Sequence, residues 1–140
     1  MSGDVVECGV AAGYTTLIFA ALTRPPWTER KIFGYDSFEG LPEPVSKDLG
    51  PESIARKGAL SATIAMAENL ISDRTGVHVG DGITLTPGWF EDTLPAHESQ
   101  IAFLFLDADM YESTLVALEA LWDKIHIGGI VGLDEYKMED

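Results

Sequence analysis

The sequence contains a single cysteine, Cys8, which excludes an internal disulfide and a zinc site built from cysteines. No apolar run is long enough to span a membrane, and no amino-terminal segment has the pattern of a signal peptide. Basic residues are few, since 9 Lys and Arg stand against 23 Asp and Glu, for a formal net charge of −14. This charge argues against nucleic acid or an anionic membrane as a partner. We expect a cytoplasmic protein.

Several catalytic signatures are missing as well. There is no Gly-x-Ser-x-Gly nucleophile motif, no Walker loop and no internal repeat. The three histidines lie in separate segments without the spacing of metal ligands, so we interpret each as a surface or loop residue: His78, His97 and His126. Cys8 lies in an apolar segment and is interpreted as a core residue. The 140 residues suffice for one domain with a hydrophobic core, residues 1–140.

The clearest positive signal is a strand–helix–strand unit in the last third of the chain. The apolar runs 101–106 and 130–133 show no polar alternation, which predicts strands buried on both faces, as in a parallel sheet. Gly128-Gly129 is the expected stop signal of the helix between them. The apolar residues of that helix recur at helical spacing: Leu115, Leu118, Leu121, Trp122 and Ile125.

Both strands of this unit end in carboxylates. Asp107 and Asp109 follow the first, and Asp134 and Glu135 follow the second. Parallel strands place their carboxyl ends at one edge, where open α/β folds bind ligands, and carboxylates gathered there attract a cation such as Mg²⁺. The alternative is a set of polar turns, with Asp109 capping the helix that begins near Tyr111. We favour a site for the other three acids, because two strand ends agree, and leave both interpretations open for Asp109.

The amino-terminal segment predicts a strand, a glycine turn and a helix. The turn has the pattern Glu7-x-Gly9-x-x-x-Gly13, which is a poor dinucleotide fingerprint, and glycines there allow close backbone approach to a ligand. An acid before the first glycine suits a cation such as the amino group of an amino-acid-like ligand. A tight turn with Glu7 solvated is the alternative, and both stay open. The helix is expected from Tyr14 to Leu22, with an inner face formed by Leu17, Ile18, Ala21 and Leu22.

The middle of the chain continues the alternation. A second strand, 31–36, ends in Asp36, an acid placed to accept hydrogen bonds from ribose hydroxyls. Residues 51–73 predict one helix, residues 83–86 a third strand, and residues 89–95 a turn or one-turn helix whose aromatics stack on a ligand ring or pack in the core. The whole order predicts an α/β, Rossmann-like, doubly wound and mostly parallel sheet with helices on both faces.

Five motifs make the prediction more specific, and they lie in order over most of the chain: residues 3–10, 36–42, 88–95, 106–114 and 128–136. Among them are Glu7-Cys8-Gly9-Val10, Asp36-Ser37-Phe38-Glu39-Gly40-Leu41-Pro42 and Leu106-Asp107-Ala108-Asp109-Met110-Tyr111. In these motifs the chain resembles the macrocin O-methyltransferase family, class I S-adenosylmethionine-dependent methyltransferases that modify sugars of macrolides and related natural products. The resemblance implies cofactor-binding residues Glu7, Gly9 and Gly13 at the methionine part, Asp36 and Ser37 at the ribose, and Gly88 and Trp89 near the adenine.

The resemblance also implies a metal and a reaction. Asp107, Asp134 and Glu135 would be Mg²⁺ ligands, although the family usually has an aspartate where Glu135 stands. Asp107, or else Asp109, would take the proton of the acceptor hydroxyl. The expected function is therefore Mg²⁺-assisted O-methyl transfer to a hydroxyl of a sugar or natural-product acceptor.

Members of the family run longer at both ends, so the chain is expected to be a methyltransferase core that lacks the last strands. Its fifth strand would leave an exposed edge, which favours a homo-oligomer. Two alternatives remain: a non-catalytic, cofactor-binding fragment, and an Asp-x-Asp metal-dependent phosphotransfer or sugar-nucleotide enzyme. A nicotinamide-dependent dehydrogenase is weakened by the glycine spacing.

Overall fold

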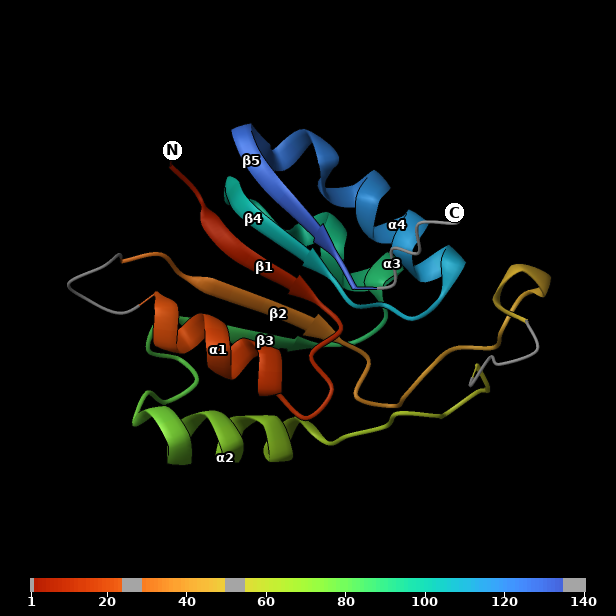
Figure 1. Cartoon of the computed structure of the whole chain (residues 1–140), viewed down its shortest axis with the longest axis horizontal. Helices are drawn as coiled ribbons and strands as arrows, with labels where there is room; N and C mark the ends of the chain where they lie inside the picture. The colour runs from red at the N-terminus through yellow and green to blue at the C-terminus, as the bar shows by residue number, and fades with distance from the viewer. Residues whose placement is uncertain (1, 24–28, 50–54, 135–140) are drawn as a thin grey trace, which may run out of the picture.

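The computed structural model describes residues 2–23, 29–49 and 55–134 (Figure 1). Strands and helices alternate along the chain: β1 (Asp4–Cys8), α1 (Tyr14–Leu22), β2 (Ile32–Asp36), α2 (Ile64–Thr75), β3 (Ile83–Pro87), α3 (Phe90–Thr93), β4 (Ile101–Leu106), α4 (Tyr111–Leu121) and β5 (Ile125–Leu133). Three 3-10 turns complete the set: η1 (Ser46–Asp48), η2 (Leu94–Ala96) and η3 (Trp122–Lys124). No helix among these ranges is long and apolar enough to cross a membrane.

The five strands form one sheet in the order β3-β2-β1-β4-β5, and every neighbouring pair is parallel. The helices α1 and α2 cover one face, and α3 and α4 cover the other (Figure 1). The predicted Rossmann-like, doubly wound fold is therefore confirmed. The strand order reverses between β1 and β4, which places the expected ligand crevice beyond the carboxyl ends of these two strands.

Side chains of alternate strand residues build one core on each face. Val6, Cys8 and Leu104 pack toward α4, whereas Val5 and Ile32 pack toward α1 and α2. Cys8 is fully buried, and burial raises the pKa of its thiol. Its interpretation as a core residue is confirmed.

A buried polar pair lies within the α4-side core. The hydroxyl of Tyr35 is 2.9 Å from Nδ1 of His97, and the His97 ring also meets Phe33 edge-on at 5.1 Å between centroids. His97 lies in a loop, as interpreted, but it is not a surface residue, because it is only 5% exposed. Nothing in the local spacing marks this contact, since its partner lies on β2, 62 residues earlier.

The environment of His97 predicts an acid-sensitive contribution to stability. Burial, followed by the charge of Lys124, lowers the pKa of His97 below its ordinary 6.5. The contribution of neutral, buried His97 to the free energy of unfolding is therefore complete above about pH 6.5. It is lost as pH falls through the lowered pKa. At pH 7 we expect His97→Ala to cost about 1–3 kcal/mol, because the Tyr35 hydroxyl loses its partner. Urea unfolding of this variant and of the exposed-site control His78→Ala, at pH 5 and 7, tests both statements. A His97→Ala curve that matches the wild type at pH 7 would contradict them.

The helix predicted over residues 51–73 is wrong in its extent. Residues 55–63 are not helical, residues 51–54 lie outside the described ranges, and α2 begins only at Ile64. Thr63 is its N-cap and accepts a hydrogen bond from the Met66 N–H at 3.3 Å. Leu60, whose spacing extended the apolar stripe, has a φ of +59° and lines a cavity instead.

The predicted face of α1 is wrong, and that of α4 is confirmed only for Leu118 and Leu121, which pack in the core. On α1 the buried residues are Thr16 and Ala20, while Ile18 and Leu22 are exposed. On α4 the buried residues are Ala117 and Leu121; the expected face also included Leu115 and Trp122, which are exposed. The buried residues of α1, Thr16 and Ala20, are small, whereas α4 buries the large side chain of Leu121 beside Ala117.

β5 differs from its prediction in both length and burial. Gly128-Gly129 does not separate helix from strand; it lies inside β5, where the register slips from Ile101 opposite Ile125 to Phe103 opposite Ile130. β5 is an edge strand in the described part of the chain, and Ile127 is 95% exposed. Among the described residues β5 is the last strand of the sheet, as expected, whereas its predicted burial on both faces is wrong.

Candidate functional site

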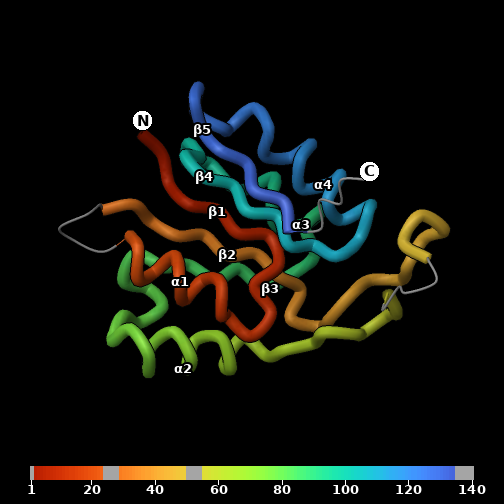
Figure 2. The backbone as a smooth tube through the Cα atoms, viewed as in Figure 1, coloured from red at the N-terminus to blue at the C-terminus, as the bar shows by residue number. Residues whose placement is uncertain are grey.

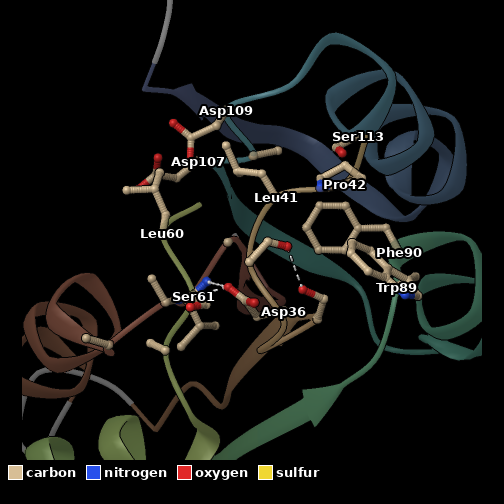
Figure 3. A pocket seen from close by; sticks show the side chains of 18 of the residues that line it. Asp36, Leu41, Pro42, Leu60, Ser61, Trp89, Phe90, Asp107, Asp109 and Ser113 are labelled. Carbon is tan, nitrogen blue, oxygen red and sulfur yellow. Dashed lines mark hydrogen bonds between the residues drawn. The ribbon is translucent and has the colours of Figure 1, made fainter. Parts of the chain in front are cut away.

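A cavity of about 720 Å³ opens at the carboxyl ends of the strands, at the predicted edge (Figure 3). Its walls come from the turn after β1, the loop after β2, residues 60–62, the start of α3 and the turn between β4 and α4. The predicted site residues that line it are Gly9, Asp36, Ser37, Trp89, Asp107 and Asp109. No single segment forms the cavity, because its walls come from different connections between the strands and helices.

Asp36 lies at the end of β2 and is fixed by three backbone N–H groups. Val10 and Ala11 each donate to its Oδ2 at 2.8 Å, and Phe38 donates to its Oδ1 at 2.7 Å. Since a carboxylate oxygen accepts about two hydrogen bonds, Oδ1 has one acceptor position left. The neighbouring Ser37 closes its own turn, because its hydroxyl donates to the Gly40 carbonyl at 3.1 Å.

Glu7 is fully buried, so the alternative of a solvated Glu7 is wrong. Its Oε2 accepts a hydrogen bond from the Thr16 hydroxyl, and its Oε1 has no hydrogen-bond partner. Burial, with the charges of Asp107 and Asp36, outweighs the lowering effect of the Thr16 hydrogen bond and raises the pKa of Glu7 to about 8. Glu7 is not among the residues that line the cavity. It lies on the strand beneath the glycine turn.

The three glycines predicted to bind the cofactor, Gly9, Gly13 and Gly88, each have a different structural role. Gly9 has a φ of +100°, and a Cβ there would lie 1.8 Å from the Asp107 carbonyl oxygen, so the glycine lets the turns after β1 and β4 touch. Gly13 is the N-cap of α1 and packs on Ala67. Gly88 donates its N–H to the Asp36 carbonyl at 2.9 Å. Gly13 and Gly88 do not line the cavity, whereas Trp89 beside Gly88 does (Figure 3).

Asp107 follows β4 at the centre of the carboxylate group. Burial, followed by the charges of Asp134, Asp109 and Asp36, raises the pKa of Asp107 to about 6. The backbone brings these strand ends together, since Asp107 N–H donates to the Cys8 carbonyl at 2.9 Å and Asp134 N–H donates to the Leu106 carbonyl at 3.0 Å. The predicted gathering of acids from two strand ends is thus present for Asp107 and Asp134.

The alternative in which Asp109 caps α4 is wrong. Met110 occupies the N-cap position and makes no side-chain cap bond. The N–H of Tyr111 instead donates to Oδ1 of Asp48, at 2.7 Å, from a segment 63 residues earlier. Asp109 is exposed and lines the cavity with a φ of +58°.

The metal prediction fits the donor chemistry of two residues. Asp107 and Asp134 repel one another, and a divalent cation relieves such repulsion; Mg²⁺ is commonly held by one or two protein carboxylates together with water and substrate oxygens. The third predicted ligand, Glu135, lies outside the described residues. Within the described ranges no group of three or more His, Cys, Asp or Glu side chains is arranged to hold a metal.

Backbone strain is concentrated at this cavity. The described non-glycine residues with positive φ are Ala11 at +45°, Phe38 at +55°, Leu60 at +59° and Asp109 at +58°. Three of them line the cavity, and Phe38 follows Ser37, which also lines it. Such conformations each cost on the order of 1–3 kcal/mol and cluster at functional sites. The strain supports the cavity as the functional centre.

The comparison with known families identifies the class of the chain. The family description that matches the chain is Macrocin-O-methyltransferase (TylF), over residues 1–140. The chain belongs to this family. Two curated relatives are each 34% identical: the Streptomyces olivaceus 8-demethyl-8-(2,3-dimethoxy-alpha-L-rhamnosyl)-tetracenomycin-C 4'-O-methyltransferase, over 98% of the chain, and the Streptomyces niveus demethyldecarbamoylnovobiocin O-methyltransferase, over 97%.

A solved relative shares the fold closely. CalS11, a calicheamicin methyltransferase, superposes with a TM-score of 0.83 at 28% identity, over 96% of the chain. A second structure of CalS11, described as a TDP-rhamnose 3'-O-methyltransferase, gives a TM-score of 0.68. The chain spans 54% and 53% of the two Streptomyces relatives and 58% of the first CalS11 chain. It therefore matches about half of each family member.

Several residues of the cavity of this family member were not identified from sequence. The strongest omissions are apolar. Four come from the loop after β2 and its return, and one from the first turn of α2: Leu41, Pro42, Leu60, Ala62 and Met66. Phe90 lies beside Trp89 (Figure 3), and Glu112 and Ser113 come from the first turn of α4. Leu41 and Pro42 lie in one of the five family motifs, and this motif could have indicated them as cavity residues. Residues 60–62 were assigned to a helix, and nothing in the sequence indicated that they line a cavity.

Proposed function

We propose that the chain binds S-adenosylmethionine in this cavity and methylates a hydroxyl of a sugar or related natural-product acceptor. The observation that carries the proposal is Asp36, held by three backbone N–H groups with one acceptor position left, at the strand-order reversal of a macrocin O-methyltransferase family member. A carboxylate in this position binds a ribose hydroxyl.

The cofactor contacts follow from the walls of the cavity. Oδ1 of Asp36 accepts a ribose hydroxyl, and Ser37 lies beside it. Trp89 and Phe90 offer aromatic surface for the adenine on the wall formed by α3 (Figure 3). The turn at Gly9 and Gly13 borders the methionine part, with the buried Glu7 beneath it. Bound S-adenosylmethionine supplies a methyl group on a positively charged sulfur, already activated for attack by an oxygen.

The proton of the acceptor hydroxyl goes to a carboxylate. Asp107 is the first candidate, because without a metal its pKa is raised to about 6, close to neutral pH, where a carboxylate accepts and releases protons readily. Bound Mg²⁺ would lower that pKa and make Asp107 a weaker base. Asp109, exposed at the same wall, is the second. Asp107 and Asp134, with Glu135, would hold Mg²⁺, which when bound lowers the pKa of a coordinated hydroxyl.

The charge of the cavity favours a glycoside acceptor over a sugar nucleotide. Six of the described lining residues are acids, and Lys, Arg and His are absent from that set: Asp36, Glu43, Glu91, Asp107, Asp109 and Glu112. A diphosphate in this setting would meet negative charge with no basic side chain among the described lining residues, and only the proposed Mg²⁺ would offset it. The same lining weakens the phosphotransfer and sugar-nucleotide alternative. Cofactor binding without methyl transfer remains the second candidate function, because the chain spans about half of its relatives.

The Asp107→Asn variant tests the reaction. We expect it to bind S-adenosylmethionine within about threefold of the wild type but to transfer methyl groups 10²- to 10⁴-fold more slowly, the usual contribution of a general base. The assay follows labelled methyl transfer to demethyldecarbamoylnovobiocin and to TDP-rhamnose, with Asp123→Asn on η3 as the exposed-site control. Full activity of Asp107→Asn would exclude its assigned role. Binding without transfer to either acceptor in the wild type would favour the cofactor-binding alternative.

A further inference from the structure

One wall of the cavity is a loop that reaches across to another helix. Residues 37–49, here called the strap, leave β2 and run to the start of α4 (Figure 2). Near their beginning, Leu41 and Pro42 line the cavity. Leu41 is paired with the return of the loop, since its N–H donates to the Ala59 carbonyl at 2.8 Å and its carbonyl accepts from Gly58 at 2.9 Å.

The far end of the strap is fastened to α4 by two contacts. Tyr111 is the first residue of α4, so its N–H has no partner within the helix, and Asp48 accepts it through Oδ1 at 2.7 Å. The other oxygen of the same carboxylate accepts from Val45 N–H at 2.8 Å and closes η1. Beside it, Nζ of Lys47 lies 3.6 Å from the centroid of the Tyr111 ring. One carboxylate therefore closes the turn and caps the helix.

These polar contacts carry more weight because the far end of the strap buries little apolar surface. Lys47 and Ser46 are exposed, and Leu49 is 60% exposed. Segments with few buried apolar contacts open at low free-energy cost unless specific bonds hold them. A negative charge at the amino end of α4 also interacts favourably with the helix dipole.

We propose that Asp48 and Lys47 are positioning residues of the cavity, although neither lines it. By joining the strap to α4 they hold Leu41 and Pro42 in the cavity wall and fix the first turn of α4, which contributes Glu112 and Ser113 to the same cavity. The fastening itself follows from the contacts alone. Only its effect on cofactor binding rests on the proposed function.

The experiment compares two carboxylates of the same chemistry. Asp48→Ala removes the fastening. Asp4→Ala is the matched control, because Oδ1 of Asp4 also accepts a remote backbone N–H, that of Lys31, at 2.9 Å, and it lies at the start of β1, away from the cavity. Lys47→Met removes the charge but keeps most of the stem. Asp48→Asn keeps one side-chain oxygen to cap α4 but loses the acceptor of the Val45 N–H, so it isolates the cap.

Amide hydrogen exchange of the unliganded chain is read first. We expect at least tenfold faster exchange over residues 41–49 in Asp48→Ala, a smaller rise in Lys47→Met, and none in Asp4→Ala. Titration with S-adenosylhomocysteine should then show three- to tenfold weaker binding for Asp48→Ala, with Asp48→Asn within twofold of the wild type and Asp4→Ala unchanged. Unchanged exchange in Asp48→Ala, or equal weakening in Asp4→Ala, overturns the proposal. If no variant and no wild type binds, the proposed function fails, and the exchange data still decide the fastening.

Discussion

The Glu7→Gln variant is expected to lack a pH-dependent fall in stability that the wild type shows. In the wild type, Glu7 should lower the free energy of unfolding by on the order of 4–5 kcal/mol between pH 4.5 and pH 8. Burial raises the pKa of Glu7 from 4.5 to about 8, so over this interval the folded chain retains a proton that the unfolded chain releases. The contribution of Glu7 is therefore complete below about pH 4.5 and is lost as pH rises toward 8, at roughly 1.4 kcal/mol per pH unit. Glutamine does not titrate and keeps an oxygen for the Thr16 hydroxyl.

The measurement is urea unfolding of the wild type and Glu7→Gln at pH 5, 6.5, 8 and 9. We expect the two stability curves to converge or cross, with the glutamine variant the more stable at pH 9. Glu119→Gln, on the exposed side of α4, is the control and should follow the wild type. Parallel curves for the wild type and Glu7→Gln would show that Glu7 does not hold its proton in the folded chain.

Replacing Asp36 with alanine is expected to weaken S-adenosylmethionine binding by about 10- to 150-fold. The free Oδ1 position provides one hydrogen bond from a ribose hydroxyl to a charged group, worth about 1.5–3 kcal/mol. The variant also leaves three backbone N–H groups without their acceptor, so the turn after β1 loses its fixed shape. Both effects act in the same direction on affinity.

Calorimetric titration measures this affinity, and unfolding is recorded for the same samples so that loss of fold is separated from loss of binding. Glu39→Ala is the control, because Glu39 belongs to the same loop but is exposed and does not line the cavity. It should bind as the wild type does. Wild-type affinity in a folded Asp36→Ala chain would remove Asp36 from the site.

The sequence predicted the parts of the site that local pattern and topology determine. Unbroken apolar runs marked β4 and the second half of β5, and acids at their ends had to reach one edge because parallel strands share a direction. Asp36 and Asp107 were therefore identifiable from their places at strand ends, and both line the cavity. The predicted roles of Gly13 and Gly88 stay predictions, since neither residue reaches the cavity wall.

The remaining features depend on contacts between segments far apart in the chain. Spacing cannot show that Asp48 caps α4, that His97 meets Tyr35, or that Thr16 faces the buried Glu7. The apolar stripe of residues 51–73 failed for a related reason: Leu60 is apolar because it lines a cavity, and periodicity does not distinguish that use from a helix face. Nor does an apolar run distinguish the edge strand β5 from a buried one.

Calorimetric titration of the purified chain with S-adenosylmethionine, with NAD⁺ as the control ligand, tests the central claim most directly. We predict saturable binding of S-adenosylmethionine and none of NAD⁺, because the turn after β1 lacks the dinucleotide glycine spacing and Asp36 is positioned for one ribose. A chain that is folded by circular dichroism but does not bind S-adenosylmethionine would contradict the account.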